Sequence, residues 1–552
     1  MSGHLPMTNE LSTQASPRRF IEPMNSMNVD DAIDRFSAPI SRDYKIQILR
    51  PFGVYSRRSY SSTITLPIGQ AYLAGMLEGA GYAVGIIDAI GEDLEGIRVS
   101  QDGRYRIQGL SSEKIIARID QDTDVLGISL MFSQEWPPQR DLITEIRSVF
   151  PNLTIVVGGE HATALPEHVL KTCPGIDYLV RGEGELTFLE LVSALANAED
   201  PTNVAGVYSL DESGTLISSG LSRRIADVNN IPRPAWHLLN VEDYFVGNWT
   251  MGVSFGRNMP ILATRGCPYQ CTFCSNPFMW TTRYLMRDPS SVVDEIEDLM
   301  QTYDVKSIDF ADLTAIVKKE WILSFCNELH RRSINVVWQL PSGTRSEALD
   351  HETLTAILKS GCSFLTYAPE SASQETLDMI KKRLKISRLT ESVQDAVDIG
   401  HSVKINLIIG FPHETRRMIL QTLQFVWRMA ARGVQDCNVA IFTPYPGSEL
   451  YDELRAKKQI GSLDDQYFHD LLIQFDFTMM KSFCDNVPGW ELAVHRFLAM
   501  GLFYVISYGR HPTRLIRLIR SLLSNDFQAH NVFEQRVYDY LVRARLLKRS
   551  ST

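Results

Sequence analysis

Residues 41–205 alternate between short apolar runs and segments with apolar residues at helical spacing. Apolar runs predict strands near residues 45–50, 82–88, 124–130, 153–157 and 176–180. The spacing between them predicts helices over 67–79 and 137–150, and a further helix from residue 186. Alternating strands and helices indicate an open, Rossmann-like parallel sheet, whose ligands lie beyond the carboxyl ends of its strands.

A second alternating series occupies residues 251–458. Its predicted strands lie near residues 261–263, 307–310, 336–340, 364–368, 404–409 and 438–443, with helices between them. Repeated strand–helix units of this kind fit a partial (β/α)6 barrel. The fold class expected is therefore α/β, with two successive domains of different architecture.

Three further segments lack this alternation. Residues 1–40 are rich in Ser, Asn, Met and Pro and are expected to form a mobile tail. Residues 206–250 contain Pro232 and Pro234, which predict an extended connector. Residues 459–552 are expected to be a helical region with a basic face, which is either solvated or in contact with phosphate or anionic lipid.

Size and charge limit the class of protein. The chain has 552 residues, 44% of them hydrophobic, and a formal net charge of -10, so nothing favours nucleic acid as a partner. No apolar run approaches the roughly 20 residues that span a bilayer. The apolar stretch 497–508 is expected to be a buried helix, and no integral membrane segment or signal peptide is predicted.

Three cysteines carry the strongest chemical signal. Cys267, Cys271 and Cys274 have the spacing C-x3-C-x2-C. Thiolates are the usual ligands of a 4Fe–4S cluster, and three of them leave one iron open for the amine and carboxylate of an amino acid. A structural zinc site needs four ligands, and no second cysteine pair is present. The remaining five cysteines are isolated and are expected to be small buried hydrophobic residues.

The cysteine run is similar to that of the radical S-adenosylmethionine (SAM) superfamily. This resemblance covers about 200 residues and implies a partial (β/α)6 barrel. It implies that Phe273 lies near the SAM adenine, although loop packing would also explain an aromatic residue there. Arg345 is a candidate partner for the SAM carboxylate, because a guanidinium grips carboxylates with two bonds, and a surface salt bridge is the alternative.

Further matches follow the later predicted strands. Residues 368–373 resemble the family's G-I-E-S-G-S run, which implies that Glu370 and Ser371 contact SAM. Ala368, Pro369 and Ala372 depart from that run, which leaves its backbone path in doubt. Gly410 and Pro444 match the ends of strands five and six, and both also have an ordinary role in turns. The resemblance implies reductive cleavage of SAM to methionine and a 5′-deoxyadenosyl radical, which removes a hydrogen atom from carbon.

Glycine-rich strand ends characterise the N-terminal half. Gly158, Gly159 and His161 follow one predicted strand, Gly182 and Glu183 follow the next, and Ser129 lies in the strand before both. Before a radical SAM domain, this pattern resembles the cobalamin-binding domain of cobalamin-dependent radical SAM proteins. Glycine lets the backbone approach a large ligand closely. The resemblance implies that His161 lines a pocket for the cobalamin tail, with ligation of cobalt as the alternative. For the domain as a whole, a ligand-free scaffold is the alternative.

The loop after the first strand departs from one cobalamin pattern. Domains that place a histidine below cobalt show D-x-H-x-x-G, whereas residues 50–59 contain no histidine. We expect no imidazole from this loop on the lower face of cobalamin. The sequence does not decide whether Tyr55 or Arg57 covers that face.

The resemblance implies a methylase that acts on an unactivated carbon through the deoxyadenosyl radical and methylcobalamin. The alternatives are an oxidative cyclase of the anaerobic magnesium-protoporphyrin ester type and a non-catalytic cobalamin or iron–sulfur sensor. A small-molecule substrate is expected, and the apolar C-terminal stretch hints at a large hydrophobic one, although core packing explains it equally well. An electron donor such as flavodoxin or ferredoxin and a reducing, cytoplasmic location are also expected.

Overall fold

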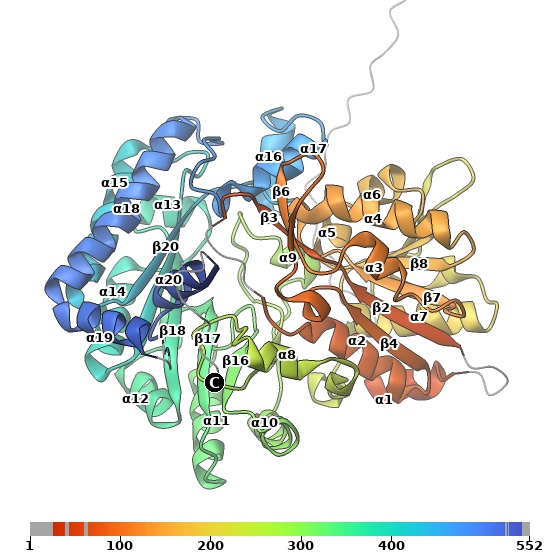
Figure 1. The fold of residues 1–552 in the computed structure, drawn as a ribbon, viewed down its shortest axis with the longest axis horizontal. Coiled ribbons are helices and arrows are strands. Elements are labelled where there is room, and N and C mark those ends of the chain that lie inside the picture. Colours follow the sequence, from red (N-terminus) through yellow and green to blue (C-terminus); the bar gives the residue numbers. More distant parts are fainter. Residues whose placement is uncertain (1–25, 39–43, 60–63, 525–526, 528, 544–552) are drawn as a thin grey trace, which may run out of the picture.

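The N-terminal domain is built on a seven-stranded sheet (Figure 1). The computed structural model describes residues 26–38, 44–59, 64–524, 527 and 529–543. The sheet order is β11-β10-β9-β8-β7-β2-β4. The parallel strands are β2 (Lys45–Arg50), β4 (Ala83–Asp88), β7 (Val125–Ser129), β8 (Thr154–Gly158) and β9 (Tyr178–Val180), each close to its predicted range.

Both faces of this sheet are buried. Ile155 and Val157 of β8 pack into one apolar cluster, and Val156 between them packs into another. Helix α4 (Trp136–Val149) contributes to the first cluster, while α2 (Ile68–Gly79) and α7 (Gly184–Ala196) contribute to the second and contact each other. Burial on both faces explains why these strands are apolar runs in the sequence.

The second domain is a curved sheet of six parallel strands in chain order, as the strand pattern predicted (Figure 1). These strands are β13 (Asn258–Ile261), β16 (Ser307–Phe310), β17 (Val337–Thr344), β18 (Cys362–Glu370), β19 (Ser402–Ile409) and β20 (Asp436–Ile441). The longer helices between them are α10 (Pro289–Tyr303), α11 (Lys319–Arg331), α12 (His351–Lys359), α14 (Ile386–Ile399) and α15 (Arg416–Arg432). This is the expected partial (β/α)6 barrel.

The C-terminal region is helical, as predicted. Its helices include α16 (Glu449–Ala456), α17 (Asp465–Asp470), α18 (Gly489–Arg510), α19 (Pro512–Leu523) and α20 (Val532–Arg543). Helix α18 packs on α15 and β20 along one side of the barrel (Figure 1). The expectation of a buried helix over 497–508 is wrong, because Phe497 and Val505 are each 69% exposed. By length and apolarity α18 is the only helix in the described ranges that could cross a membrane.

The expected N-terminal tail and the expected connector both contain secondary structure that the sequence did not predict. Strand β1 (Ser26–Met27) pairs with β12 (Arg224–Ile225), and α1 (Val29–Arg35) follows it, so part of the expected tail is structured. Residues 1–25 of that tail lie outside the described residues. The expected connector begins with β10 (Val207–Leu210) and β11 (Leu216–Ser218), which extend the first sheet with antiparallel strands.

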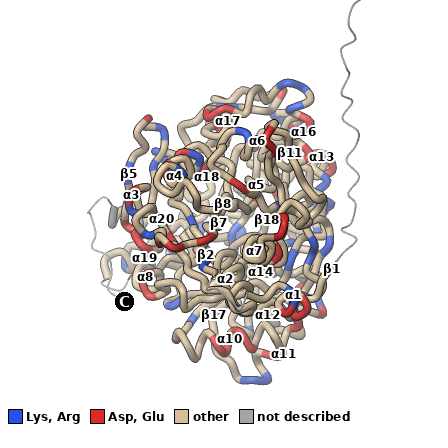
Figure 2. The backbone as a smooth tube through the Cα atoms, turned by 90° about the vertical axis from the view of Figure 1, so that its right-hand side faces the viewer, with Lys and Arg blue, Asp and Glu red and all other residues tan. Residues whose placement is uncertain are grey.

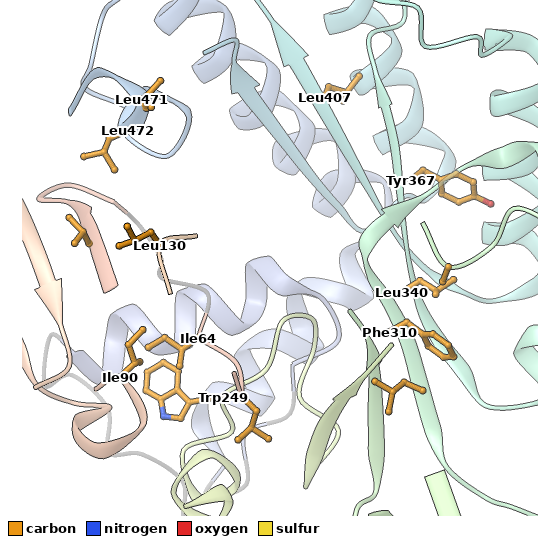
Figure 3. Packing of buried hydrophobic residues seen from close by; sticks show 14 of the residues in the cluster. Ile64, Ile90, Leu130, Trp249, Phe310, Leu340, Tyr367, Leu407, Leu471 and Leu472 are labelled. Atoms are coloured by element: carbon orange, nitrogen blue, oxygen red, sulfur yellow. The ribbon is translucent and has the colours of Figure 1, made fainter. Parts of the chain in front are cut away.

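A continuous buried cluster joins the two domains. It includes Leu130 at the end of β7, Trp249 in the connector, Leu340 in β17 and Leu471 in the C-terminal region (Figure 3). Acidic and basic residues are both spread over the side of the molecule that Figure 2 presents. The shared core holds the strand ends of both sheets in fixed relative positions.

Candidate cofactor sites

The three cysteines lie on a tight loop between β14 (Thr264–Arg265) and α9 (Asn276–Met279). Gly266, just before Cys267, has φ +83°, and a Cβ there would overlap the carbonyl oxygen of Arg283. Glycine is therefore required at the entry to the loop. The amide of Cys274 donates to the carbonyl oxygen of Cys271 at 3.1 Å, which closes the turn.

The thiols have the chemistry that a 4Fe–4S cluster requires. All three are free of disulfides, and burial raises the pKa of the Cys274 thiol to about 12. Iron displaces the proton of such a thiol when it binds. In the described ranges, no three His, Cys, Asp or Glu side chains converge as ligands of a single ion. In a 4Fe–4S cubane each thiolate binds a different iron, so the three cysteines do not converge on a single ion.

A buried ion pair lies beside this loop. Lys382 Nζ lies 2.8 Å from Glu370 Oε1, and both side chains are almost fully buried. Lys382 Nζ also lies 5.8 Å from the ring centroid of Phe273, and its charge acts on Cys271. Glu370 has φ +69°, which is uncommon for a residue with a side chain and marks local backbone strain. The sequence analysis missed Lys382, which no motif indicates.

Arg345 is buried and holds the cysteine loop in place. Its guanidinium lies 3.6 Å from the ring centroid of Tyr269, the middle one of the three residues between the first two cysteines. Its Nη2 donates to Glu347 Oε1 at 2.5 Å and to the carbonyl oxygen of Lys382 at 2.7 Å. The ion pair anticipated as the alternative is thus present, with Arg345 buried and the side chain of Glu347 39% exposed.

The other candidate SAM residues lie at the carboxyl ends of their strands. Ser371 Oγ lies 3.1 Å from Thr422 Oγ1 and is fully buried. Gly410 has φ +85°, and the carbonyl oxygen of Pro444 accepts from the hydroxyl of Tyr467 at 2.7 Å. The ring of Phe273 packs on Phe411 with centroids 5.7 Å apart. Loop packing, the alternative for Phe273, is thus observed.

Two buried carboxylates at the end of β16 bind the protein itself. Asp309 accepts from Thr250 Oγ1 and Gln339 Nε2, each at 2.6 Å, and ties the connector to the barrel. Asp312 accepts from the amide of Thr264 at 2.6 Å, and burial raises its pKa to about 6. Asp312 therefore positions β14, the strand that leads to the cysteine loop.

The candidate cobalamin residues gather at one edge of the first sheet. Strands β2 and β7 are neighbours, and the chain moves outward from them in opposite directions, to β4 and to β8. Ligands of open α/β sheets bind at such switch points. Ser129 and Gly158 end β7 and β8 side by side. Gly159 has φ +108°, and a Cβ there would lie 2.6 Å from the carbonyl oxygen of Leu130.

His161 is held in an aromatic environment behind this edge. Its Nδ1 lies 3.0 Å from Ser133 Oγ, and its ring packs on Trp136 and Phe468. Burial lowers the pKa of His161 to about 3, so its imidazole is neutral. Its Nε2 is buried and has no hydrogen-bond partner within the described part of the chain. An orphaned polar atom and glycine-lined strand ends fit a polar ligand tail at this edge.

Gly182 and Glu183 lie at the next strand end and contact the connector. The amide of Gly182 donates to Thr163 Oγ1 at 2.9 Å. Glu183 is fully buried and accepts from Arg224 Nε at 3.0 Å and from the amide of Ile225 at 3.1 Å. Glu183 therefore fastens β12 to the sheet.

The loop after β2 is a strand rather than an open loop. Strand β3 (Gly53–Ser56) pairs with β6 (Tyr105–Gln108). Arg57 is exposed, whereas Tyr55 is half-buried. Burial raises the pKa of Tyr55, and the nearby charge of Glu135 raises it further. Of the two residues that the sequence left open, Tyr55 faces the interior.

The glycine-rich edge and the cysteine loop are in direct contact. Glu160, next to Gly159, accepts a hydrogen bond from Ser275, next to Cys274. Arg265, just before the loop, donates to Glu185 Oε1 at 2.6 Å, and both side chains are buried. The segments that carry the residues predicted for two different cofactors thus meet at one interface.

Comparisons with known proteins agree with this arrangement. The profile of the B12 binding domain matches residues 59–192, and that of the radical SAM superfamily matches residues 261–426. The chain is 30% identical to the uncharacterized methyltransferase PH0819 of Pyrococcus horikoshii over 387 residues, which cover 70% of this chain and 78% of the relative. It is 31% identical to the anaerobic magnesium-protoporphyrin IX monomethyl ester cyclase of Rubrivivax gelatinosus, over 73% of this chain and 68% of the cyclase.

A solved structure has the same fold. The radical SAM methyltransferase TsrM from Kitasatospora setae, solved with cobalamin and a [4Fe-4S] cluster, aligns with a TM-score of 0.58 and 16% identity over 75% of each chain. The domain order, the cysteine loop and the relatives together define a class: the chain belongs to the cobalamin-dependent radical SAM enzymes. The predicted domain pair is confirmed. The alternative of a non-catalytic sensor has no support among these relatives, which are named as methyltransferases and a cyclase.

Proposed function

We propose that this enzyme transfers a methyl group to an unactivated carbon of a small-molecule substrate. The observation that carries the proposal is the direct contact of the glycine-rich edge with the cysteine loop, through Glu160–Ser275 and Glu185–Arg265. Methyl transfer requires a substrate radical and a methyl carrier within reach of one another. An interface formed by both candidate sites supplies that proximity.

Each side of the interface has residues suited to its group. Cys267, Cys271 and Cys274 would hold a 4Fe–4S cluster, with SAM between it and the Glu370–Lys382 pair. Ser129, Gly158 and Gly159 would hold the cobalamin tail. The cluster with SAM would supply a carbon-based radical, and cobalamin would supply the methyl group. The chain's own contribution is placement of both groups and exclusion of water.

The lysine of the ion pair extends the SAM assignment. Lys382 carries a buried positive charge next to the cysteine loop, and Glu370 carries the matching negative charge. The amino-acid part of SAM has one group of each sign, an amine and a carboxylate. We therefore assign Lys382, together with Arg345 as predicted, to the carboxylate side, and Glu370 to the amine or ribose.

The lower face of cobalamin is assigned to Tyr55. Its side chain lies on β3, which continues from the end of β2 at the switch point. Residues 50–59 contain no histidine. An electron donor such as flavodoxin or ferredoxin and a cytoplasmic location remain part of this proposal, because a reducible, oxygen-labile cluster requires both.

A second outcome has a specific relative in its favour. The cyclase of Rubrivivax gelatinosus is about as similar to this chain as PH0819 is. Under this alternative the substrate gains oxygen and loses hydrogen, whereas methyl transfer adds one methylene unit. The mass of the product separates the two.

The test is anaerobic reconstitution with iron, sulfide and hydroxocobalamin, followed by incubation with reductant and labelled SAM. We expect 5′-deoxyadenosine from the wild-type enzyme and none from alanine variants of Cys267, Cys271 or Cys274. Cys173→Ala, which removes an isolated buried thiol, should retain cleavage. Cleavage in all three loop variants would overturn the cluster assignment, and an oxygenated product would replace methyl transfer by cyclisation.

A further inference from the structure

The outer face of α18 is an exposed apolar stripe. Trp490, Val494, Phe497 and Val505 recur at helical spacing, and all four are exposed. Leu498 and Leu502 widen the stripe on one side. Isolated exposed hydrophobic residues are ordinary, but a continuous stripe along a helix marks an interaction surface.

Helix α19 continues this surface. Leu515, Ile516, Ile519 and Leu523 are exposed, with Leu523 at 80% exposure. The opposite side of the helix holds buried Leu518 and the half-buried Arg514, which donates to the carbonyl oxygen of Gly433 at 2.6 Å. The apolar face therefore points away from the protein. We call the exposed faces of α18 and α19 the C-terminal apolar surface.

The helices that carry and support this surface are strongly cationic. Helices α15, α18 and α19 contain nine arginines and one acidic residue, Glu491, in a chain whose net charge is -10. Arg428, Arg510 and Arg520 are exposed, and none of the three has a carboxylate partner among the residues that the structure describes. Their charge is thus available to an external anion.

An open groove of about 510 Å³ lies between α15 and α18. It is lined by Trp427, Arg428 and Ile506, together with Gln424 and Ala431. Trp427 Nε1 donates to the carbonyl oxygen of Leu498, at 3.4 Å. A tryptophan, an arginine and aliphatic side chains side by side match the boundary between lipid headgroups and acyl chains.

Helix α18 is bound to the protein along its inner face. Arg496 donates to the carbonyl oxygens of Ile473 and Asp476 at 2.8 and 2.6 Å, and the hydroxyl of Tyr504 donates to Asp436 Oδ1 at 2.7 Å. A spanning helix would have to break these bonds and place Arg496 in hydrocarbon. The contacts therefore favour a helix that lies on a membrane over one that crosses it.

We propose that the C-terminal apolar surface docks on an anionic lipid bilayer. The apolar residues of α18 and α19 enter the boundary of the acyl chains, and Arg428, Arg510 and Arg520 pair with lipid phosphates. Burial of apolar side chains and attraction of several arginines to anionic lipid act together in such binding. The proposal stands independently of the reaction that the enzyme catalyses.

A second copy of the chain fits this surface less well. In a twofold symmetric dimer the same patch meets itself. The exposed Arg428, Arg510 and Arg520 would then share one interface with their counterparts in the second copy. Like charges across an interface oppose association, whereas an anionic bilayer complements them.

Flotation of the full-length protein with lipid vesicles tests the proposal. We expect binding to vesicles of phosphatidylcholine mixed with phosphatidylglycerol, weaker binding to phosphatidylcholine alone, and loss of the difference at high salt. Arg510→Gln with Arg520→Gln should weaken binding to the mixed vesicles roughly thirtyfold. Phe497→Ser with Val505→Ser should weaken it at least roughly tenfold.

Matched controls lie on other faces. Val246 lies at the end of α8 (Val241–Val246) and is 72% exposed. Arg331 on α11 is also exposed, with a side-chain exposure of 67%. Val246→Ser and Arg331→Gln should leave flotation unchanged. Circular dichroism and thermal melting should show that every variant is folded.

Three outcomes would overturn the proposal. The first is equal binding to both kinds of vesicle at low salt. The second is equal binding by the surface variants and the control variants. The third is a stable dimer in sedimentation that Phe497→Ser with Val505→Ser dissociates, because the surface would then belong to a second copy.

Discussion

At the scale of single residues, the Glu370–Lys382 pair has the most distinctive geometry near the cysteines. Glu370 adopts φ +69°, and residues Lys381 and Arg383 on either side of the lysine also have positive φ, at +53° and +50°. Unfavourable backbone conformations of this kind concentrate at ligand sites. The strain at both ends of the pair points to a role beyond stability.

Lys382→Met tests that role. The variant keeps much of the side-chain length but removes the charge, so SAM affinity should fall roughly tenfold to a hundredfold. Equilibrium binding of SAM to the reconstituted enzyme measures the change, and deoxyadenosine formation should recover at saturating SAM. The neighbouring Lys381 pairs with Glu449 on the surface, so Lys381→Met serves as the control. Equal affinities for the two variants would remove Lys382 from the site.

Which site residues the sequence could predict depends on how local their signal is. The cysteines are recognisable because a cluster needs fixed spacing on one loop. Lys382 escaped notice because it reaches the loop only through tertiary packing. Arg345 stacks on the ring of Tyr269 within the loop and donates to the backbone carbonyl oxygen of Lys382. Asp309 illustrates the converse: it lies at the carboxyl end of a barrel strand, where ligands of parallel sheets bind, yet its oxygens bind Thr250 and Gln339.

At the scale of elements, the end of β8 is a tightly packed point of the candidate cobalamin edge. Gly159→Ala would place a Cβ 2.6 Å from the carbonyl oxygen of Leu130, in a backbone conformation that strains alanine. We expect a loss of about 2–4 kcal/mol in the free energy of unfolding and weakened cobalamin binding. Denaturant titration and cobalamin absorbance measure these effects.

Gly214 is a control that separates the cost of a positive φ from the cost of a steric clash. Gly214 has φ +77°, and a Cβ there would meet nothing within 4 Å. Gly214→Ala should therefore cost only about 1 kcal/mol and leave cobalamin binding intact. Similar losses for both variants would show that the approach of Gly159 to Leu130 is unimportant.

The elements themselves were largely predictable, and the exceptions have physical reasons. Central strands such as β7 and β8 are buried on both faces and are therefore apolar runs. Strands β10 and β11 lie at the sheet edge and are short, so their sequences carry little signal. Helix α18 was expected to be buried because its own apolar residues are spread around its circumference. Composition alone does not say which side of such a helix faces solvent.

At the scale of the whole molecule, ion pairs hold the two domains together. Arg265 and Glu185 are both buried, and they join the cysteine loop to the first helix after β9. Arg140 of α4 and Asp465 of α17 form a more exposed pair that joins the N-terminal domain to the C-terminal region. The interface between the candidate sites therefore depends most on the buried pair.

Glu185→Gln leaves Arg265 with a buried charge and no carboxylate at that position. Removing one partner of a buried pair typically costs about 3–5 kcal/mol, so the domain interface should open at lower denaturant concentration. Limited proteolysis and denaturant titration measure this change. Glu167→Gln, which breaks the exposed pair with Lys171, should cost less than about 1 kcal/mol. A similar response in both variants would mean that the buried pair does not hold the interface.

The position of α18 also has a consequence for self-association of shortened chains. Strand β20 is the last strand of the barrel sheet, and α18 packs against it while Tyr504 bonds Asp436 and Arg514 bonds Gly433 nearby. A chain that ended before residue 489 would leave this edge without its cover. Exposed strand edges pair with other chains, so such a fragment would aggregate even though every strand of its barrel is present.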